Sequence, residues 1–222
     1  MVKTLSRRFV LQSLAAGVAA ASHTLSFSSA RRSMPVSKAK GAFIIHNDLP
    51  WALETCRSQF GFGPITPASH LFVRNNLPTP PASLIAQGDD WSFDVSGCAR
   101  EGSLTLADLK RMKSRTVATV LQCSGNGRDF FPHNPSGSQW AVGAAGCVLW
   151  TGVTVADIFE QFGGVKSDLS YLTATGGEEL PEGVNQDAVV VERSVPIEKG
   201  LKDCLLVWEM NGAPLPMIHG GP

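Results

Sequence analysis

The residue best suited to chemistry in this sequence is Cys123, which follows an apolar, β-branched stretch at 116–121 and begins a loop. Gly125 and Gly127 let the backbone of that loop approach a bulky ligand closely. Arg128 supplies a positive charge that helps a thiol to stay ionised, and a soft thiolate suits a transition metal better than a hard cation. The residue types alone still favour a buried structural cysteine, because free cysteines are usually buried and inert.

The other cysteines and histidines offer no comparable site. None of the five cysteines forms the Cys-x-x-Cys spacing of a zinc or redox motif. The four besides Cys123 are interpreted as small buried hydrophobes: Cys56, Cys98, Cys147 and Cys204. A heme-attachment motif is also absent from the sequence, so any electron acceptor is expected to be a separate protein.

The loop at 121–128 resembles the molybdenum-ligand loop of sulfite oxidases and their bacterial relatives. Four further blocks resemble the same family in the same order, at 71–78, 140–153, 208–212 and 219–220. The resemblance covers residues 43–222. Several ordered blocks are much more specific than one short motif. The chain is therefore identified as a member of this family, and an α+β, mixed-sheet molybdopterin-binding domain is expected.

The resemblance also implies a molybdenum–molybdopterin cofactor and a set of site residues. Cys123 would be the metal ligand, with Arg74 and Arg128 as catalytic residues in the substrate pocket. Trp140 would form a wall of that pocket, although packing in the core is an equally good interpretation of a tryptophan. The residues expected to contact the cofactor are Arg74, Asn75, Asn76, Cys123 and His219, where Asn76 replaces the histidine usual in the family.

The implied reaction is oxidation of sulfite or a similar small sulfur oxyanion by oxygen-atom transfer, with electrons passed to a separate cytochrome c. Two guanidinium groups suit such a substrate, because arginine forms planar, charge-assisted pairs with oxyanions. One alternative is a sulfoxide reductase, acting for example on methionine sulfoxide, with the same cofactor. Another is a non-catalytic, truncated cofactor-binding remnant. The relatives continue beyond the segment that ends at Pro222, so the C-terminal part of the domain is expected to be missing.

The elements that must hold these residues are short. The 22 glycines and 14 prolines favour many turns and short strands. Strands are predicted at 91–95, 116–121, 169–174 and 204–209, the second of them buried by its composition. Helices are predicted to follow Thr105 and Thr154 as N-caps. Asn211–Gly212 predicts a hairpin turn with a return strand at 215–218, whereas 44–60 carries few regular signals.

The first 30 residues have the layout of an export signal. A basic start and a mild apolar run precede small residues, and the segment around Arg7 and Arg8 resembles a twin-arginine signal, with an ordinary Sec leader as the alternative. The predicted organisation is a signal peptide at 1–30, a mobile mature N-terminus at 31–42 and an incomplete molybdopterin-binding domain at 43–222. A periplasmic location and no membrane span in the mature chain are expected. The 19 basic and 19 acidic residues give no reason to expect nucleic-acid binding.

Overall fold

A computed structural model describes residues 39–48, 50–61, 63–77, 82–176 and 192–221. The chain divides into two compact units, 1–35 and 36–222, and every described residue belongs to the second. The predicted signal peptide and most of the predicted N-terminal segment at 31–42 lie outside the described residues, so those boundaries stay predictions. Within the described part of the chain, no helix is both long enough and apolar enough to cross a membrane.

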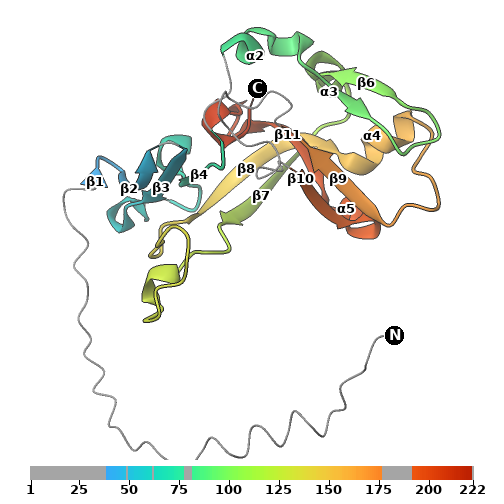
Figure 1. The fold of residues 1–222 in the computed structure, drawn as a ribbon. Coiled ribbons are helices and arrows are strands. Elements are labelled where there is room, and N and C mark those ends of the chain that lie inside the picture. Colours follow the sequence, from blue (N-terminus) through green and yellow to red (C-terminus); the bar gives the residue numbers. More distant parts are fainter. Residues whose placement is uncertain (1–38, 49, 62, 78–81, 177–191, 222) are drawn as a thin grey trace, which may run out of the picture. The chain divides into compact units, whose positions relative to one another are not determined.

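A four-stranded sheet carries the loop that begins at Cys123. Its strands are β7 (Arg115–Gln122), β8 (Ala145–Thr154), β11 (Leu205–Met210) and β12 (Ala213–Pro214), in the order β12-β11-β8-β7. Figure 1 shows the long strands β7 and β8 side by side, and they pair from Arg115 opposite Gly152 to Gln122 opposite Ala145. The expected α+β class is confirmed. The strand pairs among the described residues are all antiparallel, so the sheets are not mixed.

A second four-stranded sheet forms where the sequence gave few signals. It runs in the order β1 (Ala39–Lys40), β2 (Phe43–Asp48), β3 (Trp51–Thr55) and β4 (Val73–Arg74). The pairing of β2 with β3 shifts register between Ile45 and Asn47, which breaks the regular alternation that marks a strand in sequence. This sheet positions Glu54 and Arg74, both of which matter below.

Besides short 3-10 helices, the remaining elements of the described residues are two strand pairs and four short α-helices. The pairs are β5 (Ser92–Val95) with β6 (Gly102–Thr105), and β9 (Tyr171–Thr175) with β10 (Glu192–Pro196). The α-helices are α2 (Ala82–Ala86), α3 (Leu106–Arg111), α4 (Val155–Gln161) and α5 (Ile197–Asp203). Thr105 and Thr154 cap α3 and α4 as predicted, and Thr105 forms a capping box with Asp108.

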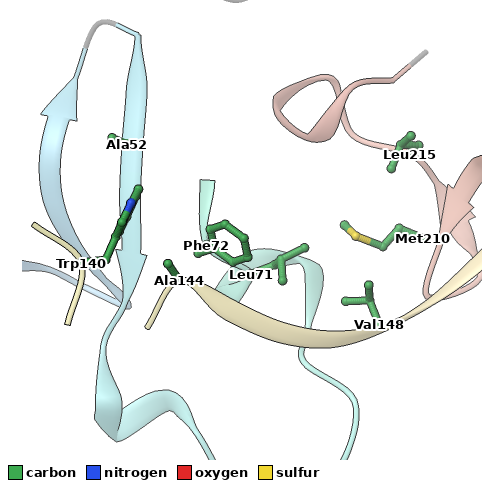
Figure 2. Close-up of a cluster of buried hydrophobic side chains, with 8 residues drawn as sticks. All are labelled: Ala52, Leu71, Phe72, Trp140, Ala144, Val148, Met210 and Leu215. Atoms are coloured by element: carbon green, nitrogen blue, oxygen red, sulfur yellow. The ribbon is translucent and has the colours of Figure 1, made fainter. Parts of the chain in front are cut away.

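Two buried clusters hold these elements together. The first brings β3, β8 and β11 together with the segments that carry Phe72 and Trp140, as Figure 2 shows. Its members are Ala52, Leu71, Phe72, Trp140, Ala144, Val148, Met210 and Leu215, and Cys123 packs at its margin. The second cluster joins β5, β6, α3 and α4 to the other end of β8 and β11. Because the first cluster touches Cys123, its packing fixes where that thiol lies.

Two predictions about strands are wrong. Strand β7 was expected to be buried, but it is at the edge of its sheet, with Val120 64% and Leu121 40% exposed. The composition of a strand indicates that it can be buried, not that a neighbouring element covers it.

The Asn211–Gly212 turn is confirmed, with φ angles of 56° and 76°, but its return strand is only Ala213–Pro214. Pro214 and Pro216 lack the N–H that would extend the ladder, and a 3-10 helix follows at Met217–His219.

Candidate functional site

Cys123 lies just beyond the end of β7, in a loop that is tied to β8 by hydrogen bonds. The Cys123 backbone N–H donates to the carbonyl of Ala144 at 2.9 Å. The Asn126 side-chain oxygen accepts from the Ala144 N–H at 3.0 Å, and the Asn126 N–H donates to the Cys123 carbonyl at 2.9 Å. This loop therefore has a fixed backbone, and the thiol at its start is half-buried and still accessible.

Two cavities open beside Cys123. The first, here called the arginine cavity, has a volume of about 400 Å³. Its lining residues are Arg74, Asn76, Cys123, Ser124, Arg128, Gly137, Ser138, Trp140 and Arg193. The second, here called the apolar cavity, has a volume of about 390 Å³. Its lining residues are Phe72, Arg74, Asn75, Leu121, Gln122, Cys123, Ile218, His219 and Gly220.

Arg128 is held firmly in the wall of the arginine cavity. Its Nη1 donates to the Ser138 carbonyl at 2.7 Å. The guanidinium lies against two glycines: a Cβ atom on Gly125 would be 2.5 Å from Nη2, and one on Gly137 would be 2.7 Å from Nη1. Any side chain at either position would therefore displace the guanidinium. Gly125, in the loop that the sequence singled out, allows an arginine to approach its backbone.

Replacing Gly137 with alanine is expected to move Arg128 and to weaken anion binding in the arginine cavity. The residue has a φ of +101°, so alanine also strains the backbone, at a cost of about 1–2 kcal/mol. Gly61 is a matched control, since its φ is +104° and a Cβ atom there would meet nothing within 4 Å. Sulfate titrations by isothermal calorimetry should show a larger dissociation constant for Gly137→Ala and an unchanged one for Gly61→Ala. An equal increase in Gly61→Ala would contradict this role of Gly137.

The charge of the arginine cavity is positive. Within the described part of the chain, Arg74, Arg128 and Arg193 form no ion pair with a carboxylate. Arg74 lies on β4 and donates to the side-chain oxygen of Asn76. The described residues that line the cavity include no acidic side chain. Guanidinium groups without counter-charges favour an anionic ligand, because each can form a charge-assisted hydrogen bond with it.

Trp140 is both a core residue and a wall of the arginine cavity. The side chain is fully buried and packs edge-on against His46 and Phe72, with ring centroids 4.8 and 6.4 Å away. Its indole Nε1 has no hydrogen-bond partner among the described residues. Buried tryptophan N–H groups usually find an acceptor, so this buried donor is an unsatisfied polar group in the wall of the cavity. The two sequence interpretations of Trp140 are thus not exclusive.

Glu54 supports the segment after Trp140, and the sequence analysis did not identify it. This carboxylate is 1% exposed and accepts hydrogen bonds from the backbone N–H groups of Ala141 at 3.1 Å and Gly143 at 2.8 Å. His46 Nε2 donates to it at 2.7 Å. Burial opposes ionisation, but the hydrogen bonds from His46, Gly143 and Ala141 outweigh it and lower the pKa of Glu54. Glu54 thereby connects β3 to the backbone next to Ala144, the partner of Cys123.

His219 and Asn75 line the apolar cavity, on the other side of Cys123. His219 ends the 3-10 helix at Met217–His219, and its backbone N–H donates to the Pro216 carbonyl at 2.9 Å. Burial lowers the pKa of the His219 ring, so the neutral imidazole predominates near pH 7. The ring also has a hydrogen bond with the backbone of Ala68, so one ring nitrogen remains for a ligand in the apolar cavity.

The predicted site residues therefore come together around Cys123. Asn76, Arg128 and Trp140 line the arginine cavity, Asn75 and His219 line the apolar cavity, and Arg74 lines both. Their chemical roles stay predictions.

Sequence reasoning missed Glu54 and Arg193, because neither lies in a recognisable block. The one sequence signal for Glu54 was its position directly after the apolar residues Ala52 and Leu53, and the structure shows that its charge is buried. Of the four cysteines expected to be buried, Cys98 is buried and the others are half-buried.

Comparison with known proteins gives consistent matches. The family model described as "Oxidoreductase molybdopterin binding domain" matches residues 77–222. Human mitochondrial sulfite oxidase is 30% identical over 167 residues, which cover 71% of this chain and 29% of that protein. Sulfite oxidase of Arabidopsis thaliana is 29% identical over 185 residues, which cover 78% of this chain and 46% of that protein. The chain thus spans less than half the length of these curated relatives.

The fold is similar to that of a solved structure as well. The match is to the sulfane dehydrogenase SoxCD of Paracoccus pantotrophus, with a TM-score of 0.62 and 21% sequence identity. It covers 87% of this chain and 48% of that chain. At this identity the likeness establishes the fold alone.

Proposed function

The chain belongs to the oxidoreductase molybdopterin binding domain family and its cofactor is molybdenum–molybdopterin, and from this premise we propose that it oxidises sulfite or a similar small sulfur oxyanion. The observation that carries the proposal is the arginine cavity beside Cys123, where three guanidinium groups have no carboxylate partner within the described ranges of the chain. Such a cavity supports an anionic substrate rather than a neutral one.

The residues present fit the cofactor. Cys123 offers an accessible sulfur between the two cavities, and sulfur is the protein donor best suited to a soft or high-valent metal. The apolar cavity offers Asn75 and His219 as hydrogen-bonding groups for a pterin, next to the apolar surface of Phe72. When bound, the cofactor would supply two-electron redox chemistry and an oxygen atom for transfer. Cys123 would hold the metal, and Asn75, Asn76, Arg74 and His219 would contact the pterin side.

The protein's own contribution to the reaction would be binding and orientation. Arg74 and Arg128 would pair with the oxygens of the anion and turn its sulfur toward Cys123. Neither can act as an acid or base near neutral pH, because guanidinium stays protonated. The fixed placement of Arg128 between Gly125 and Gly137 means that little reorganisation is needed when the anion binds. Trp140 would exclude water from one side of the cavity.

We also propose a periplasmic location reached by twin-arginine export, and a separate cytochrome c as electron acceptor. The leader at 1–30 supports the proposed export route. A fractionation experiment with the natural leader, and with Arg7 and Arg8 both changed to lysine, would test the route. Export of the doubly substituted protein through the Sec system would argue against it.

Two other functions compete with sulfite oxidation. A sulfoxide reductase would use the same cofactor, but the three arginines, which form no ion pair with any described carboxylate, favour an anion over a neutral sulfoxide. A non-catalytic, cofactor-binding remnant is the second. A cooperative thermal unfolding transition followed by circular dichroism would argue against the remnant.

The deciding experiment is production of the chain in a host that makes the cofactor. We expect molybdenum bound at about one atom per chain and reduction of cytochrome c that depends on sulfite. Methionine sulfoxide serves as the competing substrate, with a reduced dye as the electron donor. Reduction of the sulfoxide without any oxidation of sulfite would overturn the proposal, and so would protein that carries no molybdenum.

A further inference from the structure

Arg193 reaches the site from a part of the fold that no sequence block indicated. It lies on β10, which pairs with β9 and not with the sheet that carries Cys123. The side chain lines the arginine cavity together with Arg74 and Arg128. Consecutive residues of a strand point to opposite faces, so the carboxylate of Glu192 faces away from Arg193. That carboxylate instead accepts from Thr175 Oγ1 at 3.4 Å.

The three arginines of the cavity are held to different degrees. Arg128 is fixed between two glycines and bonded to the Ser138 carbonyl, and Arg74 donates to the Asn76 side chain. Arg193 donates only to the backbone carbonyl of Glu192, at 2.5 Å, within the described part of the chain. Arg193 is therefore an exposed charge at the wall of the cavity with no carboxylate partner among the residues that the structure describes, and it can turn toward a bound anion.

We propose that Arg193 is a specificity-determining residue that makes the arginine cavity select dianions over monoanions. The preferred class is the fully ionised sulfur oxyanion, such as sulfite or sulfate, over singly charged anions such as hydrogen sulfite or nitrate. This inference rests on the proposed function, and it adds the charge state of the substrate. Arg74 and Arg128 together balance one dianion, and Arg193 adds an excess positive charge.

The physical reason is that the Coulomb energy between two charges is proportional to their product. At any fixed distance and effective dielectric constant, Arg193 interacts with a dianion twice as strongly as with a monoanion. Arg193 is exposed, so dissolved salt screens this interaction, and the difference between the two kinds of anion is largest at low ionic strength. Removing Arg193 should therefore reduce affinity for both kinds of anion, but unequally.

The test uses sulfate and nitrate, two anions that this reaction does not consume, titrated into the full chain by isothermal calorimetry at low ionic strength. Arg193→Gln should weaken sulfate binding about 10-fold or more, as expected for loss of a charge-assisted hydrogen bond, and nitrate binding about 3-fold. Arg193→Lys keeps the charge and should restore most of the preference for sulfate. Arg115→Gln is the matched control, because Arg115 is exposed on β7 and lines neither cavity.

Three results would overturn the inference. Equal weakening of sulfate and nitrate in Arg193→Gln would mean that Arg193 does not discriminate charge. Unchanged sulfate binding would mean that it takes no part, and a lysine that fails to rescue would point to a packing role. A circular dichroism melt checks that each variant is folded. These titrations need no turnover. The role of Arg193 can therefore be refuted while molybdenum content and sulfite oxidation remain normal, and the proposed function can be refuted while the anion preference is observed.

Discussion

Changing Cys123 to serine is expected to lower sulfite-dependent turnover by at least about 100-fold. Removing a residue that only hydrogen-bonds to a metal ligand already lowers metal affinity or activity by about 10–100-fold. The thiol lies on the wall of both cavities, so no other described cysteine can replace it as the sulfur donor. A hydroxyl is a harder and less acidic ligand than a thiol. The loop itself is held by backbone bonds and by Asn126, so the fold should survive.

X-ray absorption spectroscopy gives a readout that does not depend on activity. The Cys123→Ser protein should show one fewer sulfur neighbour at molybdenum than the natural protein. Cys204→Ser is the control, because Cys204 is half-buried between α5 and β11 and lines neither cavity. An unchanged sulfur count in Cys123→Ser, with turnover close to that of the natural protein, would refute the assignment of the metal ligand.

Changing Glu54 to glutamine is expected to destabilise the fold by about 3 kcal/mol, the upper end of the range found when a buried hydrogen-bonding group loses its partner. The carboxylate accepts from two backbone N–H groups and from His46 while almost fully buried. The neutral amide places an NH₂ group where one of these donors now points, so at least one buried hydrogen bond is lost. Gly143 leaves no room for adjustment, because a Cβ atom there would lie 2.0 Å from the Thr55 carbonyl oxygen.

Glu54 also predicts a pH dependence of stability. Its pKa is lowered in the folded protein, so the folded state binds its proton less readily than the unfolded state does. The resulting stabilisation is fully present above the unfolded pKa of about 4.3, and it is lost as the pH falls through the lower, folded value. The natural protein should therefore lose stability on acidification below about pH 4.3 more steeply than Glu54→Gln, which has no carboxyl to protonate.

Urea denaturation between pH 3 and pH 7 measures both effects in one series. Glu101→Gln serves as the control, because Glu101 is exposed and its contact with Lys166 is at 3.5 Å. Surface pairs of this kind contribute at most about 1 kcal/mol. If Glu54→Gln unfolds at the same urea concentration as Glu101→Gln across the series, Glu54 is not the support for the segment after Trp140.

The sequence predicted the parts of the site that local signals mark. Cys123 was singled out by the glycines and the arginine that follow it within five residues, but only the resemblance of the loop at 121–128 assigned it to a metal site. The caps Thr105 and Thr154 were predicted because a cap is recognised from its own turn. Glu54 was not found, because its partners are 87 and 89 residues away in sequence. Arg193 was missed for the same reason, since only the folding of β10 brings it to the cavity.

The strands show the same division between local and distant causes. β5 and β11 were predicted within a residue or two, because alternation and composition are local properties. The exposure of β7 was not predicted, because it depends on which strands pair and in what order. The hairpin β2–β3 was not predicted either, because its irregular register hides the alternation.

Cys123 and Arg74 each form part of both cavities, so one pair of side chains separates two binding sites. We therefore expect occupancy on one side to alter the free energy of binding on the other, and thermodynamic linkage requires any such influence to be equal in both directions. A substitution at either residue changes both affinities together. Two double-mutant cycles test this, one pairing Arg74 with Arg128 and the other pairing Arg74 with His219. In both cycles the changes in binding free energy should be strongly non-additive.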